Sequence, residues 1–222
     1  MASARIRSVN TGRAHPMPEA STGVTGIDTA PVRSIEVRAP GPKRDGGGSG
    51  VAGDVIGNLR HHGGDQQAVY ALAREELDAW SAELGRDLPD GMFGENLTTE
   101  GIDVDAAVLG QRWQVGDRVV LRVCGPRIPC QTFAVRMGEP AWVRRFTERG
   151  RPGAYLAVEV PGTLRPGDPV VPGEPPQHGL DVMDAFAAFM GERDLAAALL
   201  VAGCLHPDDH AELERSLRRR SH

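Results

Sequence analysis

The residue best placed for chemistry is Cys130, in the segment Gly125-Pro126-Arg127-Ile128-Pro129-Cys130. The apolar run over 119–123 predicts a strand, so the cysteine follows a strand end on a turn that two prolines stiffen. Arg127 lies three residues earlier, and a neighbouring cation stabilises a thiolate, the form that attacks electrophiles or binds metals. The alternative is that Cys130 is a small buried hydrophobic residue, as many free cysteines are. This segment alone leaves both roles open.

A second group is His62-Gly63-Gly64, just before a helix that apolar spacing predicts over about 67–84, with Gly85 as its stop. Free backbone N–H groups at such a helix start could bind an anion. The alternative is that Asp65 caps the helix and His61 and His62 face solvent. The glycine run over 45–50 is either a flexible loop or a backbone that approaches a ligand closely.

Asn96 lies in the turn-rich stretch 91–101. Its amide could face a polar heterocycle, or it could bond the backbone of its own turn, which is the commoner use of asparagine. No regular pattern of metal ligands surrounds these residues. Zinc bound by His61, His62 and Cys130 is a weak alternative, because it offers only three ligands without regular spacing.

Composition limits the function classes. The 222 residues have a net charge of −5 and a single lysine, Lys43, so no basic field points to nucleic acid or an anionic membrane surface. Cys124, Cys130 and Cys204 form no C-x-x-C pair and are odd in number, which fits neither a disulfide framework nor a zinc ribbon. With no signal-like or membrane-length apolar run, we expect a cytoplasmic protein.

The elements that must position these residues are mostly short strands, in keeping with 28 glycines and 17 prolines. Strands are predicted over 4–10, 32–38, 51–59, 110–117, 119–123, 154–160 and 169–171, and a helix over 140–149. Strands punctuated by Gly-Asp turns predict a mainly β, α+β fold built on a barrel over residues 1–173. After a Pro-rich linker, the period becomes helical and predicts a three-helix module over 178–220.

Five stretches together resemble the MOSC family, the domain that forms the C-terminus of molybdenum cofactor sulfurases, and in particular its stand-alone, bacterial YiiM-like branch. They occur in the family's order and the resemblance covers about residues 4–172. The stretches are Thr25-Gly-Ile27, Gly53-Asp54, His62-Gly-Gly64 with Ala68-Val-Tyr70, Phe93-Gly-Glu-Asn-Leu-Thr98 and Pro126-Arg-Ile-Pro-Cys130. The tail resembles the 3-alpha module that often follows this domain.

The resemblance implies a MOSC β-barrel, similar to the pyruvate kinase barrel, that binds the molybdenum cofactor (Mo-molybdopterin). Cys130 matches the cysteine that ligates molybdenum and would be catalytic. Thiolate is a soft ligand that suits such a metal. The remaining cofactor-binding residues are then expected to be Arg127, Asn96, His62, Gly63 and Gly64.

Relatives in this family reduce small N-hydroxylated compounds such as hydroxylaminopurines. The implied activity is therefore a molybdenum-dependent oxidoreductase. With no iron–sulfur cysteine set and no flavin motif, its electrons must come from a separate reductase. Pyridoxal phosphate is associated with the larger sulfurases but is not expected here, because the chain is too short for their desulfurase domain.

Two positions depart from the family pattern: Thr29 stands where a lysine is usual, and Gln66 where an aspartate is usual. If that lysine contacts the cofactor phosphate, Arg33 or Arg38 could replace it. The alternative function is a non-catalytic carrier that holds the cofactor, or a persulfide, on Cys130. The sequence leaves the oligomeric state open, a homodimer included.

Overall fold

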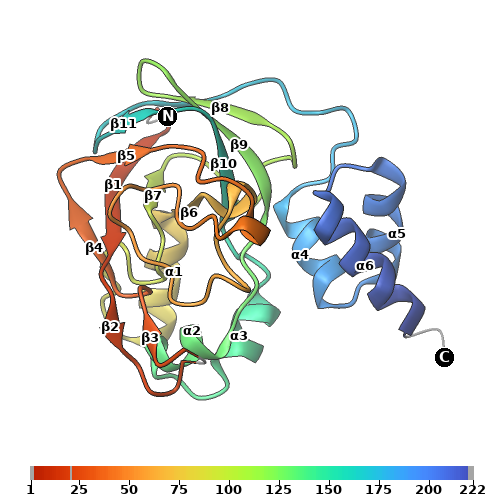
Figure 1. The fold of residues 1–222 in the computed structure, drawn as a ribbon, viewed down its shortest axis with the longest axis horizontal. Helices are drawn as coiled ribbons and strands as arrows, with labels where there is room; N and C mark the ends of the chain where they lie inside the picture. The colour runs from red at the N-terminus through yellow and green to blue at the C-terminus, as the bar shows by residue number, and fades with distance from the viewer. Residues whose placement is uncertain (1–2, 21, 220–222) are drawn as a thin grey trace.

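The computed structural model describes residues 3–20 and 22–219, which contain one mixed sheet of eight strands and six α-helices (Figure 1). The strands of this sheet are β1 (Arg5–Gly12), β4 (Thr29–Val32), β6 (Val69–Ala73), β7 (Leu97–Glu100), β8 (Arg112–Val115), β9 (Val119–Pro126), β10 (Ala154–Val160) and β12 (Val170–Pro172). Two small pairs are β2 (His15–Pro16) with β3 (Val24–Thr25), and β5 (Ile35–Val37) with β11 (Gly162–Leu164).

The helices are α1 (Arg74–Leu84), α2 (Gln131–Met137), α3 (Trp142–Arg149), α4 (Val182–Met190), α5 (Arg193–Ala202) and α6 (Pro207–Arg219). Two short 3₁₀ turns, η1 (Lys43–Asp45) and η2 (Asp65–Gln67), lie in the long connection between β5 and β6. The fold class predicted from the sequence, a mainly β, α+β protein with few helices, is confirmed.

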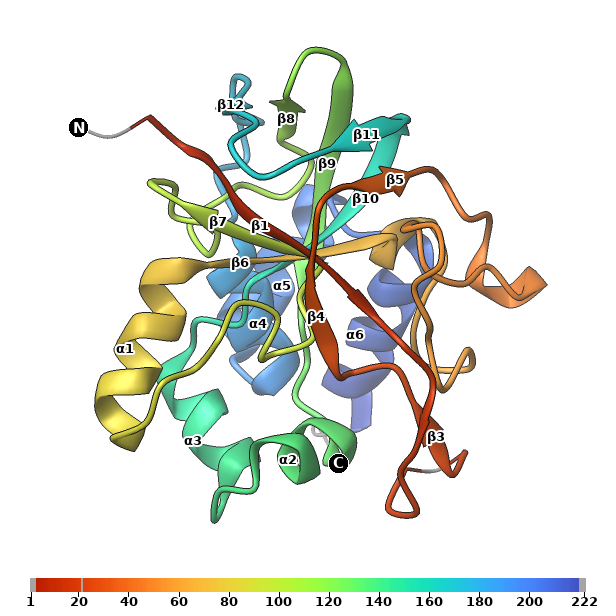
Figure 2. The ribbon, with the colours of Figure 1, turned by 90° about the vertical axis from the view of Figure 1, so that its left-hand side faces the viewer.

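The sheet runs in the order β12-β8-β9-β10-β6-β7-β1-β4, and in this sheet β6 and β7 pair in parallel while the other neighbours are antiparallel (Figure 2). A short bridge joins the end strand β12 to the start of β1, the neighbour of the other end strand, β4. Ile6 N donates to Asp168 O at 2.8 Å, Val170 N donates to Ala4 O at 2.9 Å, and Arg5 faces Pro169. This bridge, rather than a full strand pair, brings β1 back to β12.

Two sequence predictions are wrong. The expected helix over 67–84 begins only at Arg74, because residues 69–73 form β6. All five residues of β6 are buried, and a strand covered on both faces reads as a continuous apolar run that helical spacing can mimic. The expected strand over 51–59 is irregular chain, apart from an isolated bridge between Val51 and Val37.

An aromatic cluster below the sheet holds α1, α2 and α3 together. The Phe93 ring lies 5.0 Å from Phe133 and 5.6 Å from Trp142, both edge-on, and Trp142 lies 4.6 Å from Trp80. Edge-to-face pairs add about 0.5–1.5 kcal/mol each beyond the burial of their area. Phe93 belongs to the loop that enters β7, so this loop is fixed to three helices at once.

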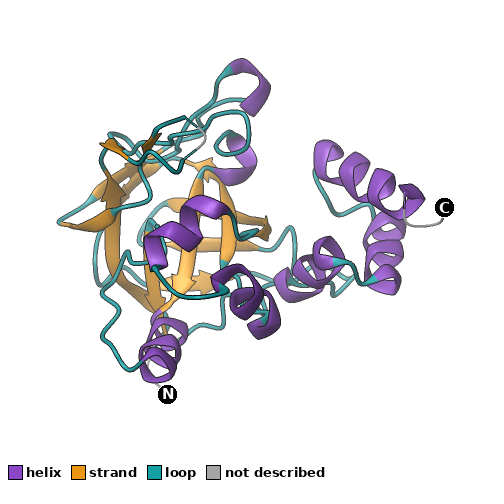
Figure 3. Ribbon diagram, turned by 90° about the horizontal axis from the view of Figure 1, so that it is seen from below, coloured by secondary structure: helices purple, strands orange, loops and turns teal. Residues whose placement is uncertain are grey.

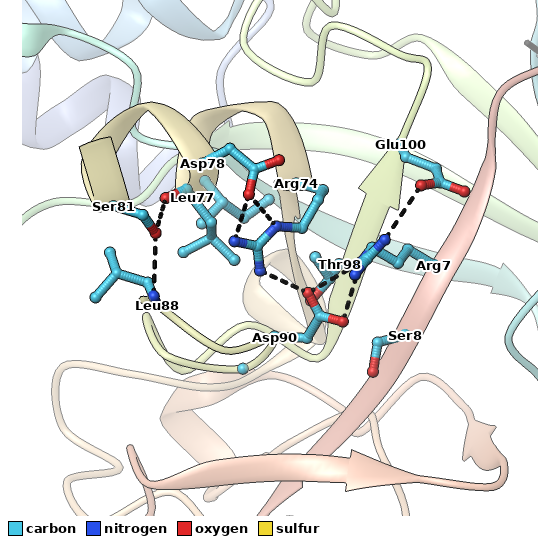
Figure 4. A network of polar contacts seen from close by, with 12 residues as sticks. Arg7, Ser8, Arg74, Leu77, Asp78, Ser81, Leu88, Asp90, Thr98 and Glu100 are labelled. Carbon is cyan, nitrogen blue, oxygen red and sulfur yellow. Dashed lines mark hydrogen bonds and ion pairs between the residues drawn. The ribbon is translucent and has the colours of Figure 1, made fainter. Parts of the chain in front are cut away.

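A network of polar contacts fixes the other end of the same loop (Figure 4). Arg74, the first residue of α1, binds Asp78 at 2.6 Å and Asp90 at 2.8 Å. Asp90 also binds Arg7 on β1 at 3.2 Å, and Arg7 lies 3.6 Å from Glu100 on β7. The network ties the turn at Asp90 to α1, β1 and β7.

The three C-terminal helices lie to one side of the sheet, as Figures 1 and 3 show. A capping box between Asp181 and Asp184 begins α4. Val182 N then donates to Ala107 O at 3.1 Å, and the Phe186 ring meets Phe146 of α3 edge-on at 6.0 Å. Since α4 shares the protein's core, the division into domains at 1–173 and 178–220 stays a prediction.

No helix in the described ranges has the length and apolar character needed to cross a membrane.

Phe186 provides a test of how α4 is held. Its side chain is 2% exposed, so Phe186→Ala should lower the free energy of unfolding by about 3–5 kcal/mol. Urea denaturation followed by circular dichroism measures the change. Val201→Ala is the control, because Val201 is 90% exposed on α5 and should change stability by less than about 0.5 kcal/mol. A Phe186→Ala loss as small as the control's would show that α4 does not depend on this contact.

Candidate functional site

A cavity of about 690 Å³ lies between the loops around β3, the long β5–β6 connection, the β9–α2 connection and the C-terminal helices. It brings together five of the six residues expected at the site. The lining includes Asn96, His62, Gly63, Arg127 and Cys130. Cavities of 300–1,000 Å³ are typical of sites for small molecules and cofactors.

Cys130 lies on the wall of this cavity, half-buried, between the end of β9 and the start of α2. Its backbone is extended, with φ −134° and ψ 170°, in the N-cap position of α2, but its side chain makes no capping hydrogen bond. Helix α2 was not predicted, although the turn before Cys130 was. The thiol is therefore a free group on a fixed part of the wall.

Arg127 is the buried charge of the site, with 6% of its surface exposed. One guanidinium nitrogen donates to the carbonyl of Phe93, and the guanidinium carbon lies 4.1 Å from the Phe133 ring centre and 5.0 Å from that of Tyr70. No carboxylate of a described residue forms an ion pair with it. A buried charge is costly unless something compensates it, so this cation suits an anion held in the cavity.

The electrostatics of Arg127 link it to Cys130. Burial by itself lowers the pKa of Arg127, whereas Tyr70, Tyr155 and Cys130 raise it, and the net shift is upward. Arg127 and Cys130 are therefore close enough to interact electrostatically.

His62 is neutral in the folded protein at pH 7. Burial first, and then the positive charges of Arg127, Lys43 and His61, together lower its pKa to about 4. Lys43 also lines the cavity, and its Nζ donates to the His61 carbonyl at 3.3 Å. This wall therefore carries a positive potential, and neutral His62 can still donate one hydrogen bond.

The amide of Asn96 is already engaged within the protein. Its Oδ1 accepts from Tyr70 N at 3.1 Å, and its Nδ2 donates to Asp54 Oδ2 at 3.1 Å. Asp54 in turn accepts from Gly12 N and Ser49 Oγ, both at 2.7 Å. Asn96 lines the cavity, but its contacts tie β6 to the loop that carries Asp54.

The glycines of His62-Gly63-Gly64 serve the backbone rather than a helix start. Gly63 lines the cavity and its N–H donates to Gln67 Oε1 at 3.1 Å, while Gly64 does not line it. Gly64 has φ +79°, and a Cβ there would lie 2.6 Å from Lys43 N. Because α1 begins only at Arg74, these glycines precede the 3₁₀ turn η2 and not the helix whose N-terminus was expected to bind an anion; their part in ligand binding stays a prediction.

Both departures from the family pattern, Thr29 and Gln66, lie on the cavity wall. Thr29 Oγ1 donates to Gly91 O at 2.7 Å, so it supports the loop that leads to Asn96. Of Arg33, Arg38 and Lys43, Lys43 alone lies on the cavity wall.

Sequence reasoning also missed the aromatic and helical parts of the wall. Tyr70 and Tyr155 line the cavity with their rings 5.3 Å apart, and the C-terminal helices contribute to it as well. The zinc alternative has no support, because the described residues contain no group of three or more His, Cys, Asp or Glu side chains that could hold a metal ion.

Residues 58–171 match the MOSC domain family. The uncharacterized protein YflK of Bacillus subtilis is 33% identical over 115 residues, which are 52% of this chain and 52% of YflK. A protein named reductase from Gibberella moniliformis is 33% identical over 125 residues, 55% of this chain and 22% of that protein. The chain thus spans about half the length of YflK and much less of the fungal reductase.

Similarity to solved structures extends further along the chain. The crystal structure of YiiM from Geobacillus stearothermophilus superposes with a TM-score of 0.74 and 25% identity, covering 96% of this chain and 98% of that one. The family match contains Asn96, Arg127 and Cys130, and the superposition reaches into the C-terminal helices. The chain therefore belongs to the MOSC domain family.

Proposed function

We propose that this protein binds the molybdenum cofactor in the cavity, with Cys130 as the metal-ligating thiolate, and reduces N-hydroxylated compounds with electrons from a separate reductase. The observation that carries the proposal is the pairing of a free, half-buried Cys130 with a buried Arg127 that lacks a carboxylate partner among the described residues. Three free cysteines suit a reducing compartment such as the cytoplasm.

The residues of the cavity fit such a cofactor. A thiolate is a soft donor of the kind that molybdenum accepts. The terminal phosphate of the pterin needs cationic partners, and Lys43 and Arg127 supply positive charge on the same wall. The cavity volume of about 690 Å³ leaves room for a cofactor and a small substrate.

When bound, the cofactor supplies the two-electron chemistry that removes oxygen from an N–OH group. The overall reaction takes up two electrons and two protons and releases the amine and one water. The chain's own residues do the rest. The Cys130 sulfur would anchor the metal, Arg127 would place a cation beside it, and Tyr70 and Tyr155 would exclude water from that part of the wall.

The fungal relative named reductase supports a reductive role, since its similarity spans 55% of this chain. Its match covers 22% of its own length, so most of that protein lies outside the match. We infer that electron delivery to this chain comes from a different polypeptide.

The anchoring role of Cys130 can be tested by elemental analysis. Wild-type protein from a cofactor-producing host should contain about one molybdenum and one pterin per chain, and Cys130→Ala should contain little of either, because the metal loses its thiolate ligand. Cys204→Ala is the matched control, since Cys204 lies outside the cavity. Equal molybdenum in wild type and Cys130→Ala would refute the assignment. A persulfide on Cys130 by mass spectrometry, without molybdenum, would instead favour the carrier function.

The buried, neutral state of His62 predicts a pH dependence of stability. Its pKa is about 4 in the folded chain and about 6.5 when unfolded, so between these values the unfolded chain binds more protons and stability rises with pH. His62→Gln should remove up to about 3 kcal/mol of this rise between pH 4 and 6.5.

Comparison of the wild type with the His62→Gln variant isolates the contribution of His62 to the pH dependence of stability. Glu95 and Asp105, whose pKa values burial raises to about 7 and 6, act in the opposite direction but are common to both. The measurement is urea denaturation at several pH values. Identical pH profiles for wild type and His62→Gln would contradict the burial of a neutral His62.

A further inference from the structure

The turn that leads into β7 is built around a buried carboxylate. Glu95 is fully buried, and it accepts hydrogen bonds from Gly91 N at 2.6 Å, Phe93 N at 3.0 Å and Thr98 Oγ1 at 2.9 Å. Among the described residues it forms no ion pair. Acidic side chains are almost never fully buried without a charged partner, and burial raises the pKa of Glu95 to about 7 in spite of these donors. An ionisable group kept here at such a cost points to a role beyond filling space.

The Glu95 carboxylate fixes the shape of this turn. Gly91 and Gly94 have φ angles of +87° and +80°, which favour glycine, and Gly94 N donates to Gly91 O at 2.8 Å. The N–H groups of Gly91 and Phe93 both donate to the carboxylate. Without it these two N–H groups would be buried and unsatisfied, which costs enough free energy for the turn to rearrange.

The same turn supplies the carbonyl that holds Arg127. The guanidinium Nη1 donates to Phe93 O, and a Cβ added to Gly94 would lie 3.6 Å from Nη1, so the turn passes directly beside the cation. The Tyr70 hydroxyl is a further polar neighbour of the guanidinium. No carboxylate in the described chain pairs with Arg127. The place of this cation on the cavity wall therefore depends on the Phe93 carbonyl, and through it on Glu95.

We infer that Glu95 is a positioning residue for Arg127: its carboxylate sets the turn whose carbonyl holds the guanidinium where an anion in the cavity can meet it. The inference deepens the proposed function, and it rests on that function for the identity of the anion, which is the cofactor. Glu95 is not part of the cavity lining, so it acts through Arg127 and touches no reacting group.

Sulfate is a suitable probe, because its charge does not change near neutral pH and it can be titrated into the full chain without cofactor. Isothermal titration calorimetry at about pH 8 should show that Glu95→Gln binds sulfate about tenfold more weakly than wild type, because the amide has a single acceptor oxygen for the two N–H groups of the turn. Arg127→Met should lose at least as much affinity. Equal sulfate affinity in Glu95→Gln and wild type would overturn the inference, and so would a wild type that binds no sulfate.

Glu76→Gln is the matched control. Glu76 is a second buried glutamate, but it binds Arg149 and Arg151 and lies outside the cavity lining. Its replacement should lower stability, because it breaks a buried ion pair, and should leave sulfate affinity unchanged. A loss of sulfate affinity equal to that of Glu95→Gln would show that general loosening of the fold, and not the Phe93 carbonyl, weakens anion binding.

The pH dependence of sulfate binding tests the role of Glu95 without any substitution. The charged and titratable groups around its turn are Arg127, Tyr70, Asp90 and, through the Asn96 amide, Asp54. Burial raises the pKa of Tyr70 well above its usual range, so its hydroxyl stays protonated. Because the pKa of Glu95 is about 7, its ionisation is the change near neutral pH that this arm follows.

Sulfate affinity of the wild type should rise about fivefold between about pH 6 and about pH 8. A carboxylate accepts stronger hydrogen bonds than a neutral carboxyl group, and the ionised share of Glu95 rises from about a tenth to about nine-tenths over this range. Loss of positive charge elsewhere with rising pH can only lower the affinity. A fall in sulfate affinity would show that Glu95 acts merely as a nearby negative charge and would overturn the inference.

A last arm separates this inference from the proposed function. In cofactor-loaded protein, Glu95→Gln should retain less pterin after gel filtration than Glu76→Gln, because its Arg127 is no longer held against the cofactor. Equal pterin retention in the two variants would count against the inference. The sulfate titrations use protein without cofactor, so failure of the molybdenum test leaves their result standing.

Discussion

The placement of the Arg127 guanidinium is the constraint on which much of this architecture depends. Taking an unpaired cation out of water costs several kcal/mol, and the protein offsets this with polarisable and polar neighbours instead of a carboxylate. The rings of Phe133 and Tyr70 face the guanidinium, and the carbonyl of Phe93 accepts its hydrogen bond. These three contacts come from α2, β6 and the loop before β7, so the charge joins three separate segments.

The carbonyl of Phe93 can face Arg127 only because its turn is held rigidly. The buried carboxylate of Glu95 accepts from Gly91 N at 2.6 Å, Phe93 N at 3.0 Å and Thr98 Oγ1 at 2.9 Å. Burial raises the pKa of Glu95 to about 7 in spite of these bonds. The polar network around Asp90 then fixes the start of the same turn to α1 and β1. Rigid support of this kind keeps a site organised before any ligand arrives.

Local patterns predicted α3, the three C-terminal helices and six of the described strands, because alternation and helical spacing persist there over whole elements; these strands are β1, β5, β8, β9, β10 and β12. They failed over 69–73, where a strand buried on both faces has no polar side to identify it. Five of six site residues were brought to one cavity as expected, because each lies on a turn with an unusual composition. Asp209 and Glu212 could not be predicted, since they reach the cavity through the packing of α4 on the sheet.

The two kinds of charge in the cavity differ in strength for a physical reason. Arg127 acts from a buried position, where the effective dielectric constant is low and salt screens little, so its effect on an anion in the cavity is strong. Asp209 and Glu212 lie on the α6 side of the cavity, and water and ions weaken the interactions of an exposed charge such as Glu212 to about 1 kcal/mol or less. Charge on the buried wall therefore acts more strongly on a bound group than charge on the α6 side.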